Sequence, residues 1–255
     1  MLLAIDIGNS NIVFGICDED RWVRQWRLRT DPFKMPDEYS VLFRDLLREE
    51  NIVGTDLDQV IMSSVVPSLT GKIQEMTRGL AGQEPLIVGP GVKTGIKINI
   101  ANPSELGTDI ICNCVAAYER FKSSCIVVDF GTALTFTGLS DEGEFLGVAI
   151  APGFQSAAEA LSSHTAQLPQ VWLEPPEKVL GRNTIQSIQS GVIYGYTSLV
   201  ENMIDRIKKE IGKDVPVIAT GGRANVVAKL TDRFTEKEPW LILEGLKIIA
   251  KKNRR

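Results

Sequence analysis

The sequence has a single histidine, His164, and only four cysteines among its 255 residues. Zinc sites are built mainly from histidine and cysteine, and one histidine with scattered cysteines does not supply a ligand set. Cys112 and Cys114 are two positions apart on an expected helix, so their side chains point to different faces. Four cysteines do not form a disulfide framework in a chain of this length, and we expect all four to be small buried side chains.

Long hydrophobic runs and a surplus of basic residues are also missing. No apolar stretch approaches the roughly 20 residues that span a bilayer, and the short run at 2–5 meets Asp6 with no basic segment before it. The chain carries 28 basic and 32 acidic residues, whereas nucleic-acid-binding proteins usually show a basic surplus. We therefore expect a cytoplasmic protein with neither nucleic-acid nor membrane partners, whose basic cluster at 251–255 is a solvated tail.

Hydrophobic residues make up 44% of the chain, enough for a sizeable core. Their spacing predicts helices over 37–50, 68–80, 105–121 and 240–251. A long apolar stripe from Tyr196 to Ile211 predicts a further helix, which could pack either on its own lobe or against a partner chain. Strands are expected at 2–5, 12–16, 60–66, 85–88, 126–128, 134–137, 145–150 and 215–219. This alternation predicts an α/β fold.

The chain repeats one pattern at an interval of 123 residues. Asp6 falls on Asp129 and Gly8 on Gly131, each directly after a short apolar strand. In both copies a second strand, an acidic turn and a third strand follow. Because a shared turn does not explain an aspartate at the end of both strands, we interpret the pattern as a duplication that gives two similar lobes.

The two aspartate turns combine residue types that suit phosphate and metal binding. Gly8 permits a tight turn, and Asn9, Ser10 and Asn11 offer amide and hydroxyl donors for phosphate oxygens. Asp6 can hold Mg²⁺ through water, because Mg²⁺ usually keeps several of its waters. The same arrangement recurs at Gly131 and Thr132, and Gly221 follows a third strand. The glycine signatures of P-loop and dinucleotide-binding proteins are both absent.

Together, the three glycine turns resemble the phosphate-binding and adenosine-binding segments of the actin, sugar-kinase and heat-shock-chaperone superfamily. At a finer level the chain resembles the type III pantothenate kinase family. The motifs that carry this resemblance keep family order along the chain: Asp6 to Asn11, Ser63 to Pro67, Val128 to Thr132, Ile150 to Gly153, Gly181 to Thr184, Ala219 to Gly222 and Leu243 to Leu246.

The resemblance implies a fold of two duplicated ribonuclease H-like lobes, over 1–115 and 116–255, with a nucleotide cleft between them. It also implies transfer of the ATP γ-phosphoryl group to the 4′-hydroxyl of pantothenate, the first step of coenzyme A synthesis. The family uses Mg²⁺ and a monovalent cation, K⁺ or NH₄⁺, and forms homodimers.

Individual roles follow from the same resemblance. Asp129 matches the monovalent-cation ligand and Asp109 the general base. The residues expected to bind ATP are Asp6, Ile7, Gly8, Asn9, Ser10, Asn11, Ile12, Val13, Gly131, Thr132 and Gly221. The residues expected to bind pantothenate are Gly107, Thr108, Asp109 and Thr184. An aspartate in the first turn of a helix is compatible with the role of base, because the helix dipole favours an anion there; the same position also suits a plain helix cap.

The acceptor side departs from the family pattern. Ile110 stands where an arginine is expected beside the base, and Ile100 where an aromatic hydroxyl residue is expected. Ala101 replaces a commonly acidic residue. Three readings therefore remain: a kinase for pantothenate, a kinase for another small hydroxylated acceptor, or a nucleotide-binding paralogue without catalysis that acts as a regulator. The retained Asp109 and Thr184 favour an enzyme, because a regulator needs neither.

Overall fold

The computed structural model describes residues 1–100 and 102–254. The departure at Ala101 and the last residue of the basic cluster, Arg255, lie outside the described residues. The chain divides into two compact units, each built on its own five-stranded sheet. The first unit contains residues 1–95, 102–116 and 241–254, and the second contains residues 96–100 and 117–240.

The sheet of the first unit has the order β3-β2-β1-β4-β5. β1 pairs with β2 in the antiparallel and with β4 in the parallel direction. Short turns join β1 to β2 and β2 to β3, whereas helix α2 connects the parallel strands β4 and β5. The strands are β1 (Leu2–Ile7), β2 (Asn11–Asp18), β3 (Arg21–Arg29), β4 (Gln59–Ser64) and β5 (Leu86–Ile87).

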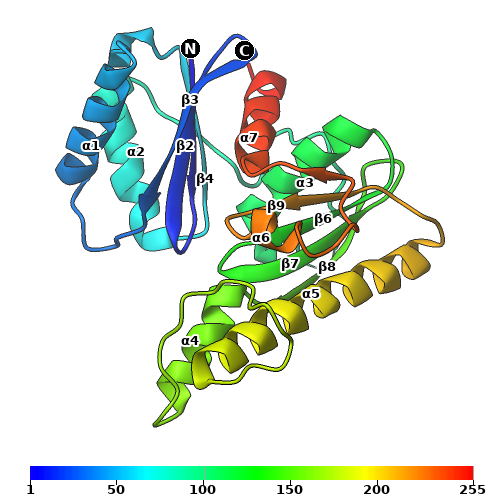
Figure 1. Ribbon diagram of the computed structural model, residues 1–255. Coiled ribbons are helices and arrows are strands. Elements are labelled where there is room, and N and C mark those ends of the chain that lie inside the picture. The colour runs from blue at the N-terminus through cyan, green and yellow to red at the C-terminus, as the bar shows by residue number, and fades with distance from the viewer. Residues whose placement is uncertain (101, 255) are drawn as a thin grey trace. The chain divides into compact units, whose positions relative to one another are not determined.

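Helices cover both faces of this sheet, and strand periodicity decides which residues face which layer. Leu3, Ile5 and Ile7 of β1 pack with α1 (Pro36–Glu49) and α2 (Pro67–Ala81), which lie side by side (Figure 1). The alternate residues, Asp6 among them, face the other side. There α7 (Leu241–Lys252) packs on β1, β2 and β4.

The sheet of the second unit has the order β10-β9-β6-β7-β8. Helix α3 (Thr108–Phe121) runs from the first unit into the second, and three further helices follow it: α4 (Phe154–His164), α5 (Thr184–Ile211) and α6 (Ala224–Val227). The 3-10 turns η1 (Gly54–Asp56) and η2 (Pro103–Glu105) are short. The strands are β6 (Cys125–Phe130), β7 (Ala133–Leu139), β8 (Phe145–Pro152), β9 (Val217–Thr220) and β10 (Glu236–Lys237).

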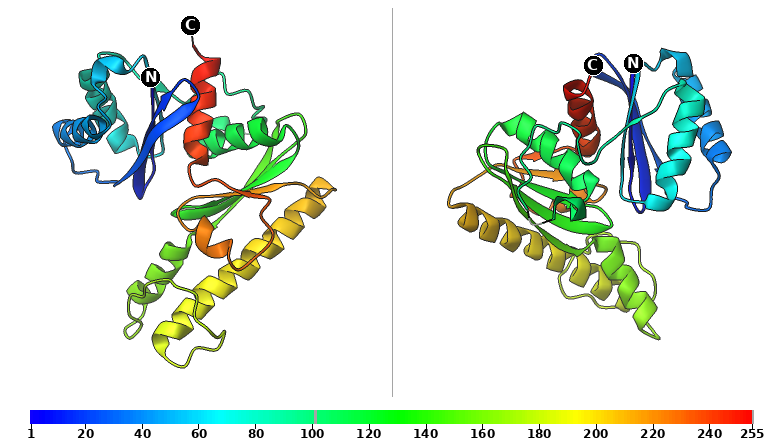
Figure 2. Two further views of the ribbon diagram at one scale, coloured as in Figure 1. Left: turned by 45° about the horizontal axis from the view of Figure 1, so that its top comes forward. Right: turned by 180° about the vertical axis from the view of Figure 1, so that it is seen from behind.

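The two helices α4 and α5 pack together and against β7 (Figures 1 and 2). Their apolar faces cover Ile126, Val128 and Phe130 of β6, which point into one core. The apolar stripe of α5 contributes to that same core, with Val200 and Ile204 fully buried. Within the second unit, therefore, this stripe packs on its own sheet.

The duplication expected from the sequence is present in the fold. β6, β7, β8, β9 and β10 repeat the order and directions of β1, β2, β3, β4 and β5. The first turn encloses residues 8–11 between paired Ile7 and Ile12, whereas the second encloses only 131–133 between paired Phe130 and Leu134. The first hairpin of the second copy is thus one residue shorter at its tip than that of the first copy.

Several features differ from the sequence expectations. Helix α4 was not expected, and α5 begins at Thr184, one dozen residues before the apolar stripe. The expected division at 115/116 lies within α3, and α7 belongs to the first unit because its apolar face packs on β1. The basic cluster is not a free tail: Lys251 pairs with Asp20, and the Asn253 side chain bonds the backbone of Lys93.

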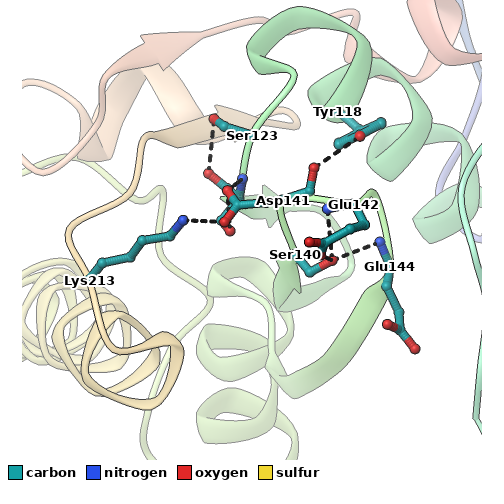
Figure 3. A network of polar contacts seen from close by, with 8 residues as sticks. Tyr118, Ser123, Ser140, Asp141, Glu142, Glu144 and Lys213 are labelled. Atoms are coloured by element: carbon teal, nitrogen blue, oxygen red, sulfur yellow. Dashed lines mark hydrogen bonds and ion pairs between the residues drawn. The ribbon is translucent and has the colours of Figure 1, made fainter.

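A polar network holds the acidic turn of the second copy, residues 141–143 between β7 and β8, in place (Figure 3). The Asp141 carboxylate accepts hydrogen bonds from the Ser124 amide and hydroxyl, both 2.9 Å long, and pairs with Lys213 at 2.5 Å. The Tyr118 hydroxyl donates to the Asp141 carbonyl at 3.1 Å. The turn between β7 and β8 is thereby joined to the end of α3 and to the loop after α5.

The four cysteines are all buried and free of disulfides, as expected. Among the described residues, no helix is both long enough and apolar enough to span a membrane.

Candidate functional site

The first group of predicted site residues lies where β1 and β4 end. Asp6 is buried and sits beside Ser63 of the neighbouring strand. The turn that follows is closed by the Gly8 amide, which donates to the Asn11 carbonyl at 3.0 Å. A Cβ on Gly8 would come within 3.1 Å of that carbonyl oxygen, so glycine gives the turn its tightness.

A residue outside the predicted set braces this turn. Thr30 donates its hydroxyl to the Gly8 carbonyl at 2.6 Å and its amide to the Ser10 carbonyl at 3.0 Å. With those carbonyls engaged, the exposed side chains of the turn can face a ligand; these are Asn9, Ser10 and Asn11. Ile7 and Ile12 are fully buried, and they can contribute only backbone groups.

Thr108 fixes the start of α3 against the end of β4. Its hydroxyl lies 2.9 Å from the Ser63 hydroxyl and accepts the Ser64 amide at 3.2 Å. The predicted acceptor-binding residue Thr108 is therefore engaged with protein groups. The contact brings the first turn of α3, which carries Asp109, to the strand ends that also carry Asp6.

Asp109 is half-buried in that first turn, and its Oδ1 accepts the Ile110 amide at 2.8 Å. Burial raises the pKa of the Asp109 carboxyl above its ordinary value, and the hydrogen bond from Ile110 opposes this effect. Gly107 makes the position possible, because a Cβ there would lie only 2.3 Å from Asp109 Oδ1. A carboxyl with a raised pKa at a helix start is better suited to accept a proton than an exposed one.

Cys112 forms part of the buried layer beneath these groups. Burial raises the pKa of its thiol well above the ordinary value, and the nearby Asp6 charge adds to the effect. The thiol therefore stays protonated and serves as a packing group. A Cβ on Gly245 of α7 would lie 1.9 Å from the Cys112 carbonyl oxygen, so α3 and α7 cross in backbone contact here.

The second group of predicted residues lies where β6 and β9 end. Asp129 is half-buried and sits beside Thr220 of β9, just as Asp6 sits beside Ser63. Gly221 follows with φ of +87°, and a Cβ there would lie 2.4 Å from Asp129 Oδ1. Only glycine combines this backbone conformation with such a close approach to the carboxylate.

The start of α4 completes this group around Thr132. The Thr132 carbonyl accepts the Gly153 amide at 3.0 Å and the Ser156 hydroxyl at 2.9 Å. A Cβ on Gly153 would lie 2.4 Å from the Gly131 carbonyl oxygen, so the helix start abuts the turn only because residue 153 is glycine. Sequence reasoning missed α4, although the spacing of Phe154, Ala158 and Leu161 marks a helical face.

Thr184 is separate from both groups in sequence and element. It is the first residue of α5 and is exposed, with Asn183 as the helix cap whose side chain accepts the Gln186 amide at 2.9 Å. Gly181 is required by the tight loop before it, since a Cβ would lie 2.5 Å from the Ser187 amide nitrogen.

The structure thus brings Asp6, Gly8 to Asn11, Thr108 and Asp109 together in the first unit. It brings Asp129, Gly131, Thr132 and Gly221 together in the second. Each group joins one carboxylate at a strand end to a tight glycine turn and a helix start, an arrangement suited to phosphate and hard cations. The described residues contain no cluster of three or more His, Cys, Asp or Glu side chains that would bind a metal without help from a ligand.

A twofold-repeated α/β unit with a carboxylate at each central strand end defines a fold class, the actin-like ATPase fold. A putative Baf family transcriptional activator from Campylobacter jejuni shares this fold. Its TM-score is 0.62 at 22% identity, over 98% of each chain.

Closer relatives resolve the family. The sequence profile of type III pantothenate kinase matches residues 2–206. Proteins named type III pantothenate kinase from Citrifermentans bemidjiense and Geobacter sulfurreducens are each 47% identical to this chain, and each match covers the full length of both sequences. The chain belongs to the type III pantothenate kinase family, and it is a kinase.

Proposed function

We propose that this protein phosphorylates pantothenate on its 4′-hydroxyl with ATP, giving 4′-phosphopantothenate, the first step of coenzyme A biosynthesis in the cytoplasm. Family membership over the whole chain supports the proposal. The observation that carries it within the structure is Asp109, a half-buried carboxylate in the first turn of α3, which Thr108 fixes to the strand ends that also carry Asp6.

Both groups of site residues contribute to ATP binding in this proposal. In the first, residues 6–13 bind phosphate through the exposed turn, and the Asp6 carboxylate holds Mg²⁺ through water. In the second, Gly131, Thr132 and Gly221 bind the nucleotide, and Asp129 coordinates a monovalent cation, K⁺ or NH₄⁺.

The residues fit these ions, because both cations prefer oxygen ligands and Mg²⁺ is commonly held by one or two carboxylates together with phosphate oxygens. When bound, Mg²⁺ neutralises charge on the transferring phosphoryl group.

Asp109 acts on the acceptor. Its carboxylate accepts a hydrogen bond from the 4′-hydroxyl, and this bond orients the hydroxyl oxygen towards the γ-phosphate. As the oxygen attacks, the carboxylate takes the hydroxyl proton. Phosphoryl transfer depends mainly on positioning, so the rigid placement of Asp109 matters as much as its basicity. The raised pKa of the carboxyl improves its capacity as a proton acceptor.

The acceptor side supports one alternative. Ile110 and Ile100 are apolar where the family pattern has an arginine and an aromatic hydroxyl residue, so neither side chain can make the polar contact to pantothenate that the pattern implies. The alternative is a nucleotide-binding protein with weak or lost pantothenate kinase activity, which acts on another small hydroxylated acceptor or as a regulator.

A direct experiment separates these functions. The protein is incubated with ATP, Mg²⁺, K⁺ and pantothenate, and the products are analysed by mass. A pantothenate product heavier by one phosphoryl group, formed by the parent and not by Asp109→Asn, supports the proposal. Binding of ATP without any product from pantothenate or related alcohols favours the regulator.

Thr184 enters the proposal through a homodimer, in which it reaches the acceptor pocket of the partner chain. The exposed start of α5 is consistent with such a role. We expect a dimer in sedimentation, and we expect Thr184→Ala to raise KM for pantothenate while leaving KM for ATP unchanged. A monomer that is fully active rules out this role for Thr184.

A further inference from the structure

Arg223 and Trp172 form a contact that none of the roles above uses. The guanidinium carbon of Arg223 lies 5.8 Å from the centre of the Trp172 ring, within the range of a cation–π contact. Trp172 is 73% exposed, an unusual state for the largest apolar side chain. A flat aromatic surface backed by a planar cation is therefore open to solvent.

The backbone beneath this surface is fixed. The Trp172 carbonyl accepts a hydrogen bond of 2.8 Å from the Gln189 side chain of α5. Its neighbours Val171 and Leu173 pack against the core of the second unit. The exposed indole is thus carried by an anchored stretch of backbone.

Two links connect Arg223 to the site residues of the second unit. Along the chain, Arg223 follows Gly221 and Gly222. Gly221 lies against the Asp129 carboxylate, and a Cβ added to Gly222 would meet no atom within 4 Å. Through space, Arg223 Nη2 donates to Gln155 Oε1 at 3.4 Å, and the next residue, Ser156, donates to the Thr132 carbonyl. Arg223 and Trp172 consequently border the group that contains Asp129, Thr132 and Gly221.

We propose that Arg223 and Trp172 form a stacking platform for the base of the nucleoside triphosphate. This inference rests on the proposed use of ATP. The open space over Gly222 permits a ligand to pass close to the backbone, and Arg223 offers a planar group that stacks on aromatic rings. Neither side chain reads hydrogen bonds on the base edge, so the platform accepts adenine and guanine alike and favours purines over the smaller pyrimidines.

The competing explanation is that the contact is a latch that only holds the loop at Trp172 against α6. The test uses Trp172→Leu and Arg223→Leu, with Phe33→Leu as the matched control. Phe33 is an aromatic side chain of the first unit that is 91% exposed. Two probes are titrated by calorimetry in the presence of Mg²⁺: a non-hydrolysable ATP analogue and inorganic tripolyphosphate, which has the phosphates but no base.

For the platform, Trp172→Leu and Arg223→Leu weaken binding of the ATP analogue about 10- to 100-fold, the effect of removing one stacking partner. Both variants bind tripolyphosphate as the parent does, and Phe33→Leu changes neither affinity. Unchanged affinity for the analogue, or equal losses for both probes together with a lower Tm, overturns the platform and supports the latch.

Tryptophan fluorescence supplies a second measurement, in which Trp172 is replaced by another aromatic residue and not by an aliphatic one. The nucleotide quenches tryptophan emission of the parent, and Trp172→Phe removes most of that quenching while retaining a stacking ring. Quenching that persists in Trp172→Phe contradicts the platform.

The inference and the proposed function fail separately. Loss of analogue affinity in Trp172→Leu, in a protein that never phosphorylates pantothenate, supports the platform and overturns the proposed phosphorylation of pantothenate. If the parent phosphorylates pantothenate and Trp172→Leu leaves KM for ATP unchanged, the proposed function is supported and the platform is overturned. A parent protein that binds neither ATP nor GTP overturns both.

Discussion

At the scale of single residues, position 110, beside the proposed base Asp109, makes the sharpest prediction. Ile110 donates its amide to Asp109, but its side chain cannot pair with a carboxylate or a phosphate. An arginine at this position would add one charged hydrogen bond, a contribution of about 1.5–3 kcal/mol.

We therefore expect Ile110→Arg to raise kcat/KM for pantothenate by about 10- to 150-fold, the equivalent of that free energy. A coupled ATP assay measures the gain, and Ile110→Leu serves as the control with no new charge. No gain from the arginine would mean that its absence does not limit this enzyme.

Gly107 provides a second residue-scale prediction. An alanine Cβ at this position would collide with Asp109 Oδ1 at 2.3 Å, so the carboxylate must move. Because small misplacements of a catalytic group are costly, we expect Gly107→Ala to lower kcat at least about tenfold. Affinity for the ATP analogue and Tm should remain near the parent values. Gly89→Ala is the control, because a Cβ there meets no atom within 4 Å, and it should leave kcat, ATP-analogue affinity and Tm unchanged. A loss of ATP affinity equal to the loss of kcat would contradict this assignment.

At the scale of elements, Asp141 joins three segments, and its effect on stability depends on pH. The Lys213 contact and the bonds from Ser124 lower the pKa of the Asp141 carboxyl to about 2, below its ordinary value of 3.8. A group with a lowered pKa stabilises the fold above its ordinary pKa, and the contribution is lost as pH falls towards 2.

We therefore expect Asp141→Asn to lower Tm at pH 7 and the difference from the parent to shrink as pH falls from 4 towards 2. The effect should also diminish at high salt, since the ion pair is exposed. Asp205→Asn removes another exposed ion pair, with Arg233, and is the control. Thermal unfolding across pH tests this, and a difference that grows in acid would refute it.

The crossing of α3 and α7 makes a further prediction at this scale. Since a Cβ on Gly245 would lie 1.9 Å from the Cys112 carbonyl oxygen, Gly245→Ala must push the helices apart. We expect a loss of about 1–3 kcal/mol in the free energy of unfolding, the usual cost of overpacking. Gly71→Ala, on α2 with no atom within 4 Å of the new Cβ, should instead stabilise the protein by about 0.5–1 kcal/mol. Urea unfolding of both variants distinguishes the two effects.

Much of each element could be predicted because its signal is local. The apolar runs 2–5 and 126–128 are strands as expected, but each strand continues one residue beyond its aspartate, so that Asp6 and Asp129 are the last residue but one of β1 and β6. The helical spacing of α4 was present in the sequence and overlooked, but the place where α4 starts depends on Gly153 fitting against the 131–132 turn, a contact between distant segments. The role of Thr30 could not be predicted either, because its bonds to Gly8 and Ser10 join the residue after β3 to the distant turn between β1 and β2.

At the scale of the whole molecule, ligand binding should raise stability by mass action. A ligand that binds only the folded protein at 100 times its Kd contributes about 2.7 kcal/mol. We expect a non-hydrolysable ATP analogue with Mg²⁺ to raise Tm, and we expect EDTA to remove most of the increase. Asp6→Asn and Asp129→Asn should each reduce the shift. A shift of the same size in both variants and in EDTA would contradict the roles given to the two carboxylates.

The membership of α7 in the first unit has a consequence for biosynthesis. β1, β2 and β4 are synthesised before most of the second unit, whereas Leu243 of α7, which would touch a Cβ on Gly15 at 3.1 Å, is synthesised after it. The second unit, by contrast, is complete at residue 240. A nascent chain that has not yet reached α7 therefore carries a first sheet with one face uncovered, and this face stays open to solvent while the whole second unit is being made.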